Sequence, residues 1–262
     1  MITEIDARAL MPSITKIIRQ AGETVMAIYA TDFETYTKED ASPVTEADMA
    51  AEAIIKPALE KLLPGVPVVA EESAAAGDIP DVGDAPFWLV DPVDGTKEFL
   101  NRNGEFTVNI ALIVDRQPVL GAVLAPALDT LYTGIVGEGA HKKVGEEAAQ
   151  RITVRPEPAE GITIVASRRH GDPEILEKFL AGRTLHETKN AGSSLKFCLV
   201  AEGSADLYPR FGPTCEWDVA AGHAVLAAAG GRVTFDDGKT PFSYAKQADF
   251  LNPHFIAWGG IE

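Results

Sequence analysis

The sequence predicts an α/β protein folded as a layered αβαβα sandwich, with two halves and the active site between them. Apolar residues recur at helical spacing in two N-terminal segments, residues 12–30 and 44–63. Short apolar runs typical of buried strands dominate residues 66–136. The remaining chain combines short strands with helices, and this mixture favours helices packed on sheets.

The two N-terminal segments carry further helix signals. Pro12 fits the first turn of the first helix. Thr45 and Asp48 have the spacing of a capping box at the start of the second. Pro57 should kink or interrupt that helix, because proline lacks the N–H of a helical hydrogen bond.

The strands and later helices follow in two groups. A hairpin is expected around residues 115–118, and the segment 156–161 is the expected boundary between halves 1–158 and 159–262. The small residues of the last helix should permit close packing on a sheet. The predicted strands are 66–70, 86–91, 106–115, 118–125, 129–136 and 162–166, and the predicted later helices are 173–181, 193–202 and 216–229.

Composition excludes several classes of protein. A net charge of −16 over 262 residues disfavours nonspecific nucleic-acid binding, which depends on basic surface. No apolar run reaches the roughly 20 residues of a membrane span, and the N-terminus lacks a secretory signal. The two cysteines, Cys198 and Cys215, make no disulfide scaffold. We therefore expect a cytoplasmic protein without an integral membrane span, and peripheral contact with the inner membrane stays open.

The segment Asp91-Pro92-Val93-Asp94-Gly95-Thr96 is the most informative motif. It follows an apolar run, and its proline and Asp-Gly pair predict a tight turn. Such a turn can direct Asp91 and Asp94 to one point, where two carboxylates repel each other unless a cation lies between them. Oxygen ligands of this kind suit Mg²⁺, and the amides of Gly95 and Thr96 could receive a phosphate oxygen if a helix starts there.

Two further acidic sites strengthen this interpretation. Glu71 and Glu72 follow the predicted strand 66–70, and Asp218 lies in the first turn of the helix 216–229. Each is ordinary alone, because first-turn acids also compensate the helix dipole. A phosphate approaching so many carboxylates would be repelled, so we predict that activity requires divalent metal.

The three acidic sites in this order resemble the metal-dependent, lithium-sensitive phosphatase superfamily of inositol monophosphatases, fructose bisphosphatases and bisphosphate nucleotidases. The finer resemblance is to the branch of CysQ-type 3′(2′),5′-bisphosphate nucleotidases, and it covers essentially the whole chain. The segments that carry it are residues 38–45, 96–99, 103–111, 192–198 and 208–214. The fold implied is the αβαβα sandwich of the inositol monophosphatase and fructose bisphosphatase type.

The resemblance implies that carboxylates and one backbone carbonyl bind two or three Mg²⁺ ions. Glu71 and Thr96 would orient the attacking water, with Asp94 in the same catalytic group. Asp40 would help to bind a third, weaker metal or its water shell, although it could instead cap a turn. The implied metal ligands are Glu71, Asp91, Val93 through its carbonyl, Asp94 and Asp218.

Substrate selection is implied to lie in the second half. In this branch, the nucleotide and its 5′-phosphate are held by equivalents of His170, Ser193, Lys196 and Arg210. On spacing alone Lys196 could equally be an exposed helix residue, and Arg168 and Arg169 could be surface charges. The implied substrate-binding residues are Gly95, Thr96, His170, Ser193, Lys196 and Arg210.

The function implied is Mg²⁺-dependent removal of the 3′-phosphate from adenosine 3′,5′-bisphosphate, a by-product of sulfur assimilation, with 3′-phosphoadenylyl sulfate as a further substrate. One alternative is an inositol monophosphatase or sugar bisphosphatase with the same metal site. Another is a nucleotide- or metal-binding protein without turnover. The expected partner is a small nucleotide bisphosphate and no nucleic acid. The oligomeric state stays open, with a monomer slightly favoured.

Overall fold

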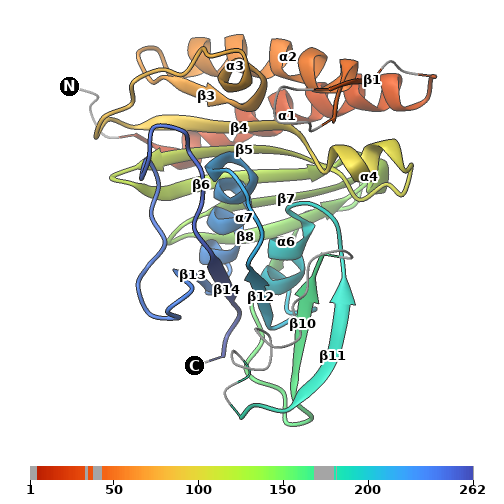
Figure 1. Cartoon of the computed structure of the whole chain (residues 1–262), viewed down its shortest axis with the longest axis vertical. Helices are drawn as coiled ribbons and strands as arrows, with labels where there is room; N and C mark the ends of the chain where they lie inside the picture. Colours follow the sequence, from red (N-terminus) through yellow and green to blue (C-terminus); the bar gives the residue numbers. More distant parts are fainter. Residues whose placement is uncertain (1–4, 33–34, 38–42, 168–179, 181, 262) are drawn as a thin grey trace.

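The computed structural model describes residues 5–32, 35–37, 43–167, 180 and 182–261. The described strands form a seven-stranded sheet, a five-stranded sheet and a two-stranded ribbon. Helices α1 and α2 cover one face of the larger sheet, and α6 and α7 lie between the two sheets (Figure 1). This arrangement confirms the predicted layered α/β sandwich.

The seven-stranded sheet has its strands in chain order, β3-β4-β5-β6-β7-β8-β9. Strands β3 and β4 are parallel, and the other neighbours are antiparallel. The predicted hairpin is confirmed, and both Asp115 and Arg116 have positive φ there. The strands are β3 (Val68–Ala70), β4 (Phe87–Asp94), β5 (Thr107–Val114), β6 (Gln117–Ala125), β7 (Thr130–Ile135), β8 (Gly139–Val144) and β9 (Gln150–Ile152).

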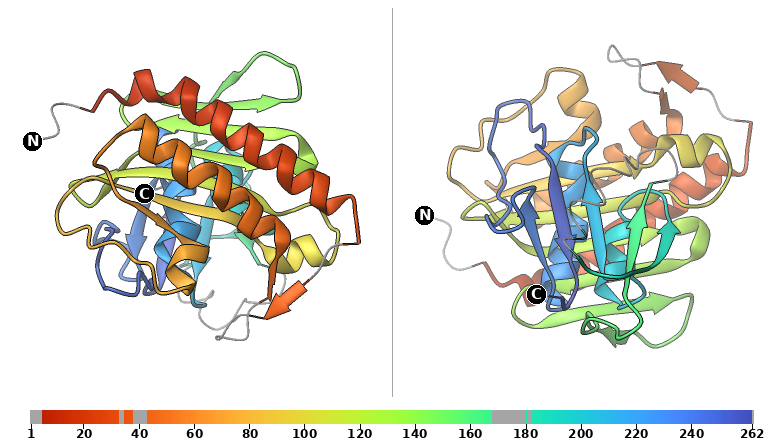
Figure 2. Two further views of the ribbon diagram at one scale, coloured as in Figure 1. Left: turned by 90° about the horizontal axis from the view of Figure 1, so that it is seen from above. Right: turned by 60° about the horizontal axis from the view of Figure 1, so that its bottom comes forward.

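The long N-terminal helices α1 (Ala7–Tyr29) and α2 (Glu46–Leu62) lie side by side across the sheet (Figure 2). The capping box of Thr45 and Asp48 is confirmed. Pro12 does not lie in the first turn, because α1 begins at Ala7. Pro57 does not interrupt α2, which continues to Leu62, and a kink at Pro57 stays a prediction. Both prolines are exposed, so water can bind the carbonyls that lose their helical donors.

Helix α7 (Glu216–Ala228) packs on the other face of this sheet, as its small residues predicted. The close approach depends on glycines in the strands. A Cβ on Gly121 would lie 2.5 Å from the carbonyl oxygen of Ala221, and one on Gly134 would lie 2.7 Å from Cα of Val225. Helix α6 (Leu195–Ala201) packs against α7.

The five-stranded sheet follows the order β11-β10-β12-β14-β13 and mixes parallel and antiparallel pairs. Most of the predicted helix 173–181 lies outside the described residues, but Leu180 packs against the apolar cluster of this sheet, which includes Ile162, Ile164 and Leu207. The strands are β10 (Ile162–Ala166), β11 (Leu185–Asn190), β12 (Leu207–Arg210), β13 (Arg232–Phe235) and β14 (Phe255–Trp258).

Several short elements were not predicted. They are β1 (Thr35–Thr37), β2 (Pro43–Thr45), α3 (Glu71–Ala75), α4 (Thr96–Leu100), η1 (Pro126–Leu128), β8 and β9. The strands from Val68 to Ile152 belong to the larger sheet and those from Ile162 onward to the smaller one. The division into halves at residue 158 stays a prediction.

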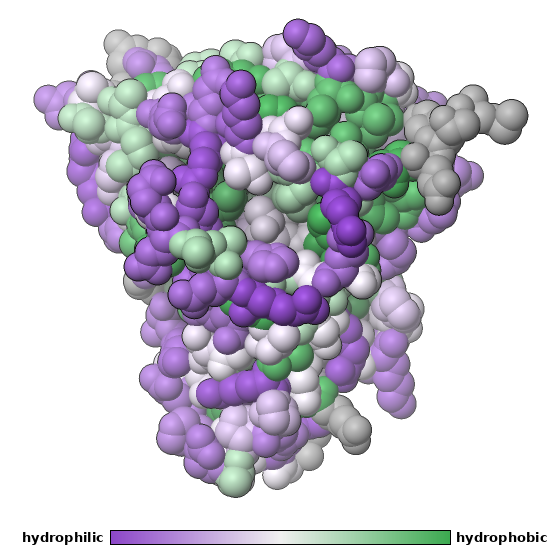
Figure 3. All heavy atoms as spheres, turned by 180° about the vertical axis from the view of Figure 1, so that it is seen from behind, coloured by the Kyte–Doolittle hydropathy of each residue, from purple (hydrophilic) through white to green (hydrophobic). Residues whose placement is uncertain are grey.

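The surface is mixed in character. The face in Figure 3 is largely hydrophilic, with apolar patches between the polar side chains. None of the described helices combines the length and apolar composition that crossing a bilayer requires.

Candidate active site

Three acidic side chains from distant parts of the sequence meet at one point. Glu71 is the first residue of α3, Asp91 lies in β4, and Asp218 lies in the first turn of α7. Each offers a carboxylate oxygen, and these oxygens all lie within 4.8 Å of one another. The predicted convergence of the three acidic sites is therefore observed.

The parallel pairing of β3 and β4 explains how Glu71 comes to lie beside Asp91. Ala70 is the register partner of Val90, so the next residues along each chain are neighbours at the same sheet edge. Glu52 of α2 holds this junction. Its carboxylate accepts hydrogen bonds from the backbone N–H groups of Glu72, at 2.8 Å, and Ser73, at 2.9 Å.

The Asp-Pro-Val-Asp-Gly-Thr turn is a bulge at the end of β4. Asp91 pairs with Asn109, but Asp94 pairs with Thr107, so one additional residue is accommodated in β4. Gly95 has φ of +86°, and α4 begins directly after it, at Thr96. The helix start on which the expected phosphate contact of Gly95 and Thr96 depends is therefore present.

Asp94 and Val93 make different contacts within this bulge. The side chain of Asp94 lines a pocket that adjoins the carboxylate cluster, and its Oδ2 lies 3.4 Å from Nδ2 of Asn109. The hydroxyl of Thr96 donates a long hydrogen bond of 3.5 Å to the carbonyl of Val93.

Asp218 is fixed by contacts at the start of α7. Its Oδ2 accepts a hydrogen bond of 2.9 Å from the backbone N–H of Cys215, the residue before the helix. The fully buried carboxylate of Glu216 binds Nζ of Lys246 at 2.6 Å. Nδ2 of Asn252 donates to the carbonyl of Cys215 at 2.6 Å. The segment that carries Lys246 and Asn252 therefore holds the first turn of α7.

The electrostatics of the cluster favour a bound cation. Burial, followed by the charge of Glu71, raises the pKa of Asp91 well above its ordinary value. Burial also raises the pKa of Asp218 to about 8, and the charges of Asp94 and Glu71 add to the effect. Oδ1 of Asp91 is buried and accepts no hydrogen bond from a described residue. Closely spaced, partly unsatisfied carboxylate oxygens fit a hard divalent metal such as Mg²⁺.

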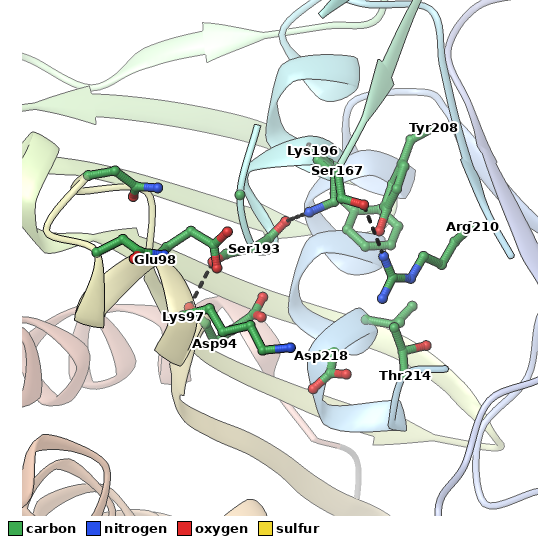
Figure 4. Close-up of a pocket in the computed structure, with 16 residues that line it drawn as sticks. Asp94, Lys97, Glu98, Ser167, Ser193, Lys196, Tyr208, Arg210, Thr214 and Asp218 are labelled. Atoms are coloured by element: carbon green, nitrogen blue, oxygen red, sulfur yellow. Dashed lines mark hydrogen bonds between the residues drawn. The ribbon is translucent and has the colours of Figure 1, made fainter. Parts of the chain in front are cut away.

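Cations from the second half line the same pocket (Figure 4). Lys196 is 5% exposed, and its Nζ donates to the carbonyl of Ser193 at 2.6 Å. Burial lowers the pKa of Lys196 to about 8, although the charge of Asp94 partly opposes this. Nε of Arg210 is buried and donates to no described residue. An anion entering this pocket would find two cations opposite the carboxylates.

The structure brings most of the predicted site residues together. Glu71, Asp91 and Asp218 form the cluster, and Asp94, Gly95, Ser193, Lys196 and Arg210 line the adjoining pocket. Thr96 and the carbonyl of Val93 lie in the turn between Asp91 and α4. Asp40 and His170 lie outside the described residues, as do Arg168 and Arg169.

Three residues at the site were not identified as such from the sequence. Asp48 was interpreted only as a cap, yet it is buried and its charge raises the pKa of Asp91. Glu52 carried no signal beyond its position in a helix. Lys97 marked the family resemblance, and the structure adds that it lines the pocket. Its ammonium has no hydrogen bond or ion pair with another described residue, and it extends toward Asp218 in Figure 4.

The fold and the acidic cluster define a metal-site protein of a known family. Residues 7–257 match the inositol monophosphatase family, and the chain belongs to it. Members of this family depend on a divalent metal, usually Mg²⁺, consistent with the cluster of Glu71, Asp91 and Asp218.

Among individual relatives, the chain is 46% identical to the 3′(2′),5′-bisphosphate nucleotidase CysQ of Escherichia coli K12, over 94% of this chain and 98% of the relative. It is 33% identical to CysQ of Haemophilus influenzae, over 95% and 93%. The crystal structure of CysQ from Bacteroides thetaiotaomicron has a TM-score of 0.80 and 36% identity, and covers 99% of this chain and 100% of its own. An inositol monophosphatase of Thermotoga maritima has a TM-score of 0.76 and 26% identity, over 95% and 92%.

Proposed function

We propose that this protein is an Mg²⁺-dependent phosphatase that hydrolyses the 3′-phosphate of adenosine 3′,5′-bisphosphate to give AMP and phosphate. The observation that carries the proposal is one pocket in which carboxylates face the buried ammonium of Lys196 and the partly buried guanidinium of Arg210. The similarity to bisphosphate nucleotidases supports it. 3′-Phosphoadenylyl sulfate, which also carries a 3′-phosphate, is proposed as a further substrate.

The proposed metal ligands are the carboxylates of the cluster, Asp94 and the carbonyl of Val93. Mg²⁺ bound there would supply the positive charge that an approaching phosphate requires. Two ions, with Asp91 shared between them, are proposed from the family resemblance. The number of ions stays a prediction, and so does a third ion near Asp40, which lies outside the described residues.

Protein side chains would then position the nucleophile. We assign Glu71 and Thr96 to orient the attacking water, with Glu71 as the acceptor of its proton. An oriented water reduces the entropic part of the barrier, because the reacting atoms are already close and aligned. Asp94 takes part through its place on the same bulge, three residues after Asp91.

Recognition of the substrate's second phosphate is assigned to Lys196 and Arg210, with His170 and the main chain of Ser193 in the same group. Nε of Arg210 is a buried donor for which no described residue provides an acceptor, so a phosphate oxygen would satisfy it. Lys97 adds another cation on the opposite wall. Holding the remote phosphate places the 3′-phosphate at the carboxylates, which uses binding energy to favour the reaction.

Phosphate release from adenosine 3′,5′-bisphosphate, inositol 1-phosphate and fructose 1,6-bisphosphate, each with Mg²⁺ and with chelator, tests the proposal. A strong Mg²⁺-dependent preference for the nucleotide is the expected result. A preference for inositol or sugar phosphate would overturn the assigned substrate and keep the metal site. No release from any of them would favour a binding protein without turnover.

A further inference from the structure

A short segment between β11 and α6 connects the metal site to the nucleotide side of the pocket. We call Gly192–Ser194 the bridge segment. Ser193 is only 9% exposed although it lines the pocket, and Ser194 is 2% exposed. Figure 4 shows Ser193 between Asp94 and Lys196. The hydroxyls of this segment are therefore directed into the protein.

The hydroxyl of Ser193 contacts the backbone of the Asp91–Thr96 turn. Its Oγ lies 2.8 Å from the carbonyl oxygen of Asp94 and 2.8 Å from that of Glu105. A hydroxyl has one proton, so these two acceptors already use its donor capacity. The contact also requires glycine at position 95, where a Cβ would lie 2.0 Å from Oγ of Ser193.

Contacts on both sides hold Ser193 in an unusual backbone conformation. Its φ is +51°, a left-handed conformation that L residues rarely adopt. On one side, the N–H of Gly192 donates to Oε2 of Glu105 at 2.7 Å. On the other, Nζ of Lys196 donates to the carbonyl of Ser193 at 2.6 Å. A strained residue maintained in this way is typical of a functional site.

Ser194 makes the corresponding contact with the second half of the metal site. Its hydroxyl donates to the carbonyl of Asp218 at 2.7 Å and accepts a hydrogen bond of 3.1 Å from Nδ2 of Asn109. Nδ2 of Asn109 also lies 3.4 Å from Oδ2 of Asp94. The bridge segment thus contacts the main chain of both Asp94, at the end of β4, and Asp218, in the first turn of α7.

We propose that Ser193 and Ser194 are positioning residues that set the spacing of Asp94 and Asp218 and couple it to Lys196, and that their hydroxyls do not bind substrate. The proposal rests on the proposed function for the identity of the ligand at Lys196. An ammonium has three donors, so Lys196 can keep the Ser193 carbonyl while it binds a phosphate oxygen. A remote phosphate would then order Lys196, Ser193 and the Asp94 turn together.

The first test measures metal binding without substrate. Calorimetric titration with MgCl₂ is compared for wild type, Ser193→Gly, Ser194→Ala and the control Ser204→Ala. Ser204 is in the same half of the chain, but its hydroxyl contacts Glu202 and not the site. Glycine deletes the hydroxyl of Ser193 and tolerates its positive φ. Both bridge variants should bind Mg²⁺ about 10–100-fold more weakly, and the control should match wild type.

Two outcomes of this titration distinguish positioning from substrate contact. Weaker Mg²⁺ binding, with native melting temperatures, supports the proposal. Unchanged Mg²⁺ binding together with a raised KM for adenosine 3′,5′-bisphosphate would overturn it, because the serines would then act as substrate ligands. Mg²⁺ binding is measured without substrate, so its result does not depend on which phosphate ester the enzyme hydrolyses. Failure of the proposed function is detected separately, by phosphate release from the three substrates with the wild-type protein.

The second test measures coupling to Lys196. The ratio of kcat/KM for adenosine 3′,5′-bisphosphate to that for adenosine 3′-monophosphate is determined for Ser193→Gly, Lys196→Ala and the double variant. Lys196→Ala should lower this ratio strongly in the wild-type background. In the Ser193→Gly background the factor by which it lowers the ratio should be at least about threefold smaller, because residues in direct contact have non-additive effects. Additive losses would overturn the coupling.

Discussion

At the residue level, the carboxylate of Asp91 combines burial with acidic neighbours on several sides. Glu71, Asp94 and Asp218 all raise its pKa, in addition to the effect of burial. Two unit charges about 4 Å apart repel each other by roughly 4 kcal/mol at an effective dielectric constant near 20. Full ionisation of these carboxylates therefore requires a cation among them, which gives the metal requirement a physical cause.

The substitution Asp94→Asn tests whether the carboxylate of Asp94 takes part in catalysis. It preserves the shape of the side chain but removes one charge from the site, so we expect kcat to fall by at least about 100-fold. The melting temperature should stay close to that of wild type. Asp115→Asn is the matched control, since Asp115 is exposed in a hairpin turn and asparagine tolerates its positive φ. Retained kcat in folded Asp94→Asn would refute the assignment.

The buried ammonium of Lys196 should make substrate selection depend on pH. Its pKa of about 8 means that it is charged below this pH and becomes neutral above it. Only the charged form attracts phosphate, so kcat/KM for adenosine 3′,5′-bisphosphate should fall as the pH rises through about 8. In Lys196→Met this additional decrease should disappear. Identical alkaline profiles in the two proteins would mean that another group titrates.

At the level of the elements, α7 connects packing with chemistry. It lies directly on the strands of the larger sheet and presents Asp218 at its first turn. Its contact surface is built from small residues on the helix and glycines on the sheet, so the helix has little freedom to shift. The position of Asp218 is consequently fixed by the core.

Gly121→Ala should reveal this close packing. The added methyl would lie 2.5 Å from the carbonyl oxygen of Ala221, so the helix or strand must move. We expect a loss of about 1–3 kcal/mol in the free energy of unfolding, measured with urea. Gly212→Ala is the control, because the nearest atom to its added methyl belongs to Arg210 at 3.5 Å, an ordinary contact. Equal stability of Gly121→Ala and wild type would show that α7 is loosely packed.

At the level of the whole molecule, the site assembles where the layers meet. Glu71 and Asp91 come from the edge of the larger sheet, Asp218 from the helix layer, and Lys196 from α6 beside the smaller sheet. A cation bound by these carboxylates would connect parts of the chain that are more than 100 residues apart. Metal binding is therefore expected to stabilise the whole fold.

Thermal unfolding with Mg²⁺ and with chelator measures this effect. At a metal concentration about 100 times Kd, the gain of roughly 2.7 kcal/mol should raise Tm by about 5–10 °C. In Asp91→Asn the gain should shrink, because one ligand charge is lost. The same variant should melt no lower than wild type in chelator, because a source of repulsion is removed. An equal Mg²⁺ effect in both proteins would place the stabilising ion elsewhere.

Local signals predicted much of the fold. The periodicity of the α1 and α2 segments, the capping box at Thr45 and the hairpin at residues 115–118 were all identified from neighbouring residues, and the structure confirms them. Both Pro12 and Pro57 lie within helices, because their exposure, which the sequence does not show, allows water to bind the carbonyls left without a donor. Short elements such as α3 and α4 are too brief to have a period and depend on tertiary contacts.

By itself, the sequence determined the fold class, the Asp91–Thr96 turn and the acidic residues after β3 and at the start of α7, because these follow from periodicity, turn residues and motif order. Only the tertiary structure decided which atoms meet. It brought Asp48 near enough for its charge to raise the pKa of Asp91, directed the hydroxyls of Ser193 and Ser194 to the main chain of Asp94 and Asp218, and buried Lys196. Distances between residues far apart in the chain depend on sheet register and layer packing, which no local pattern encodes.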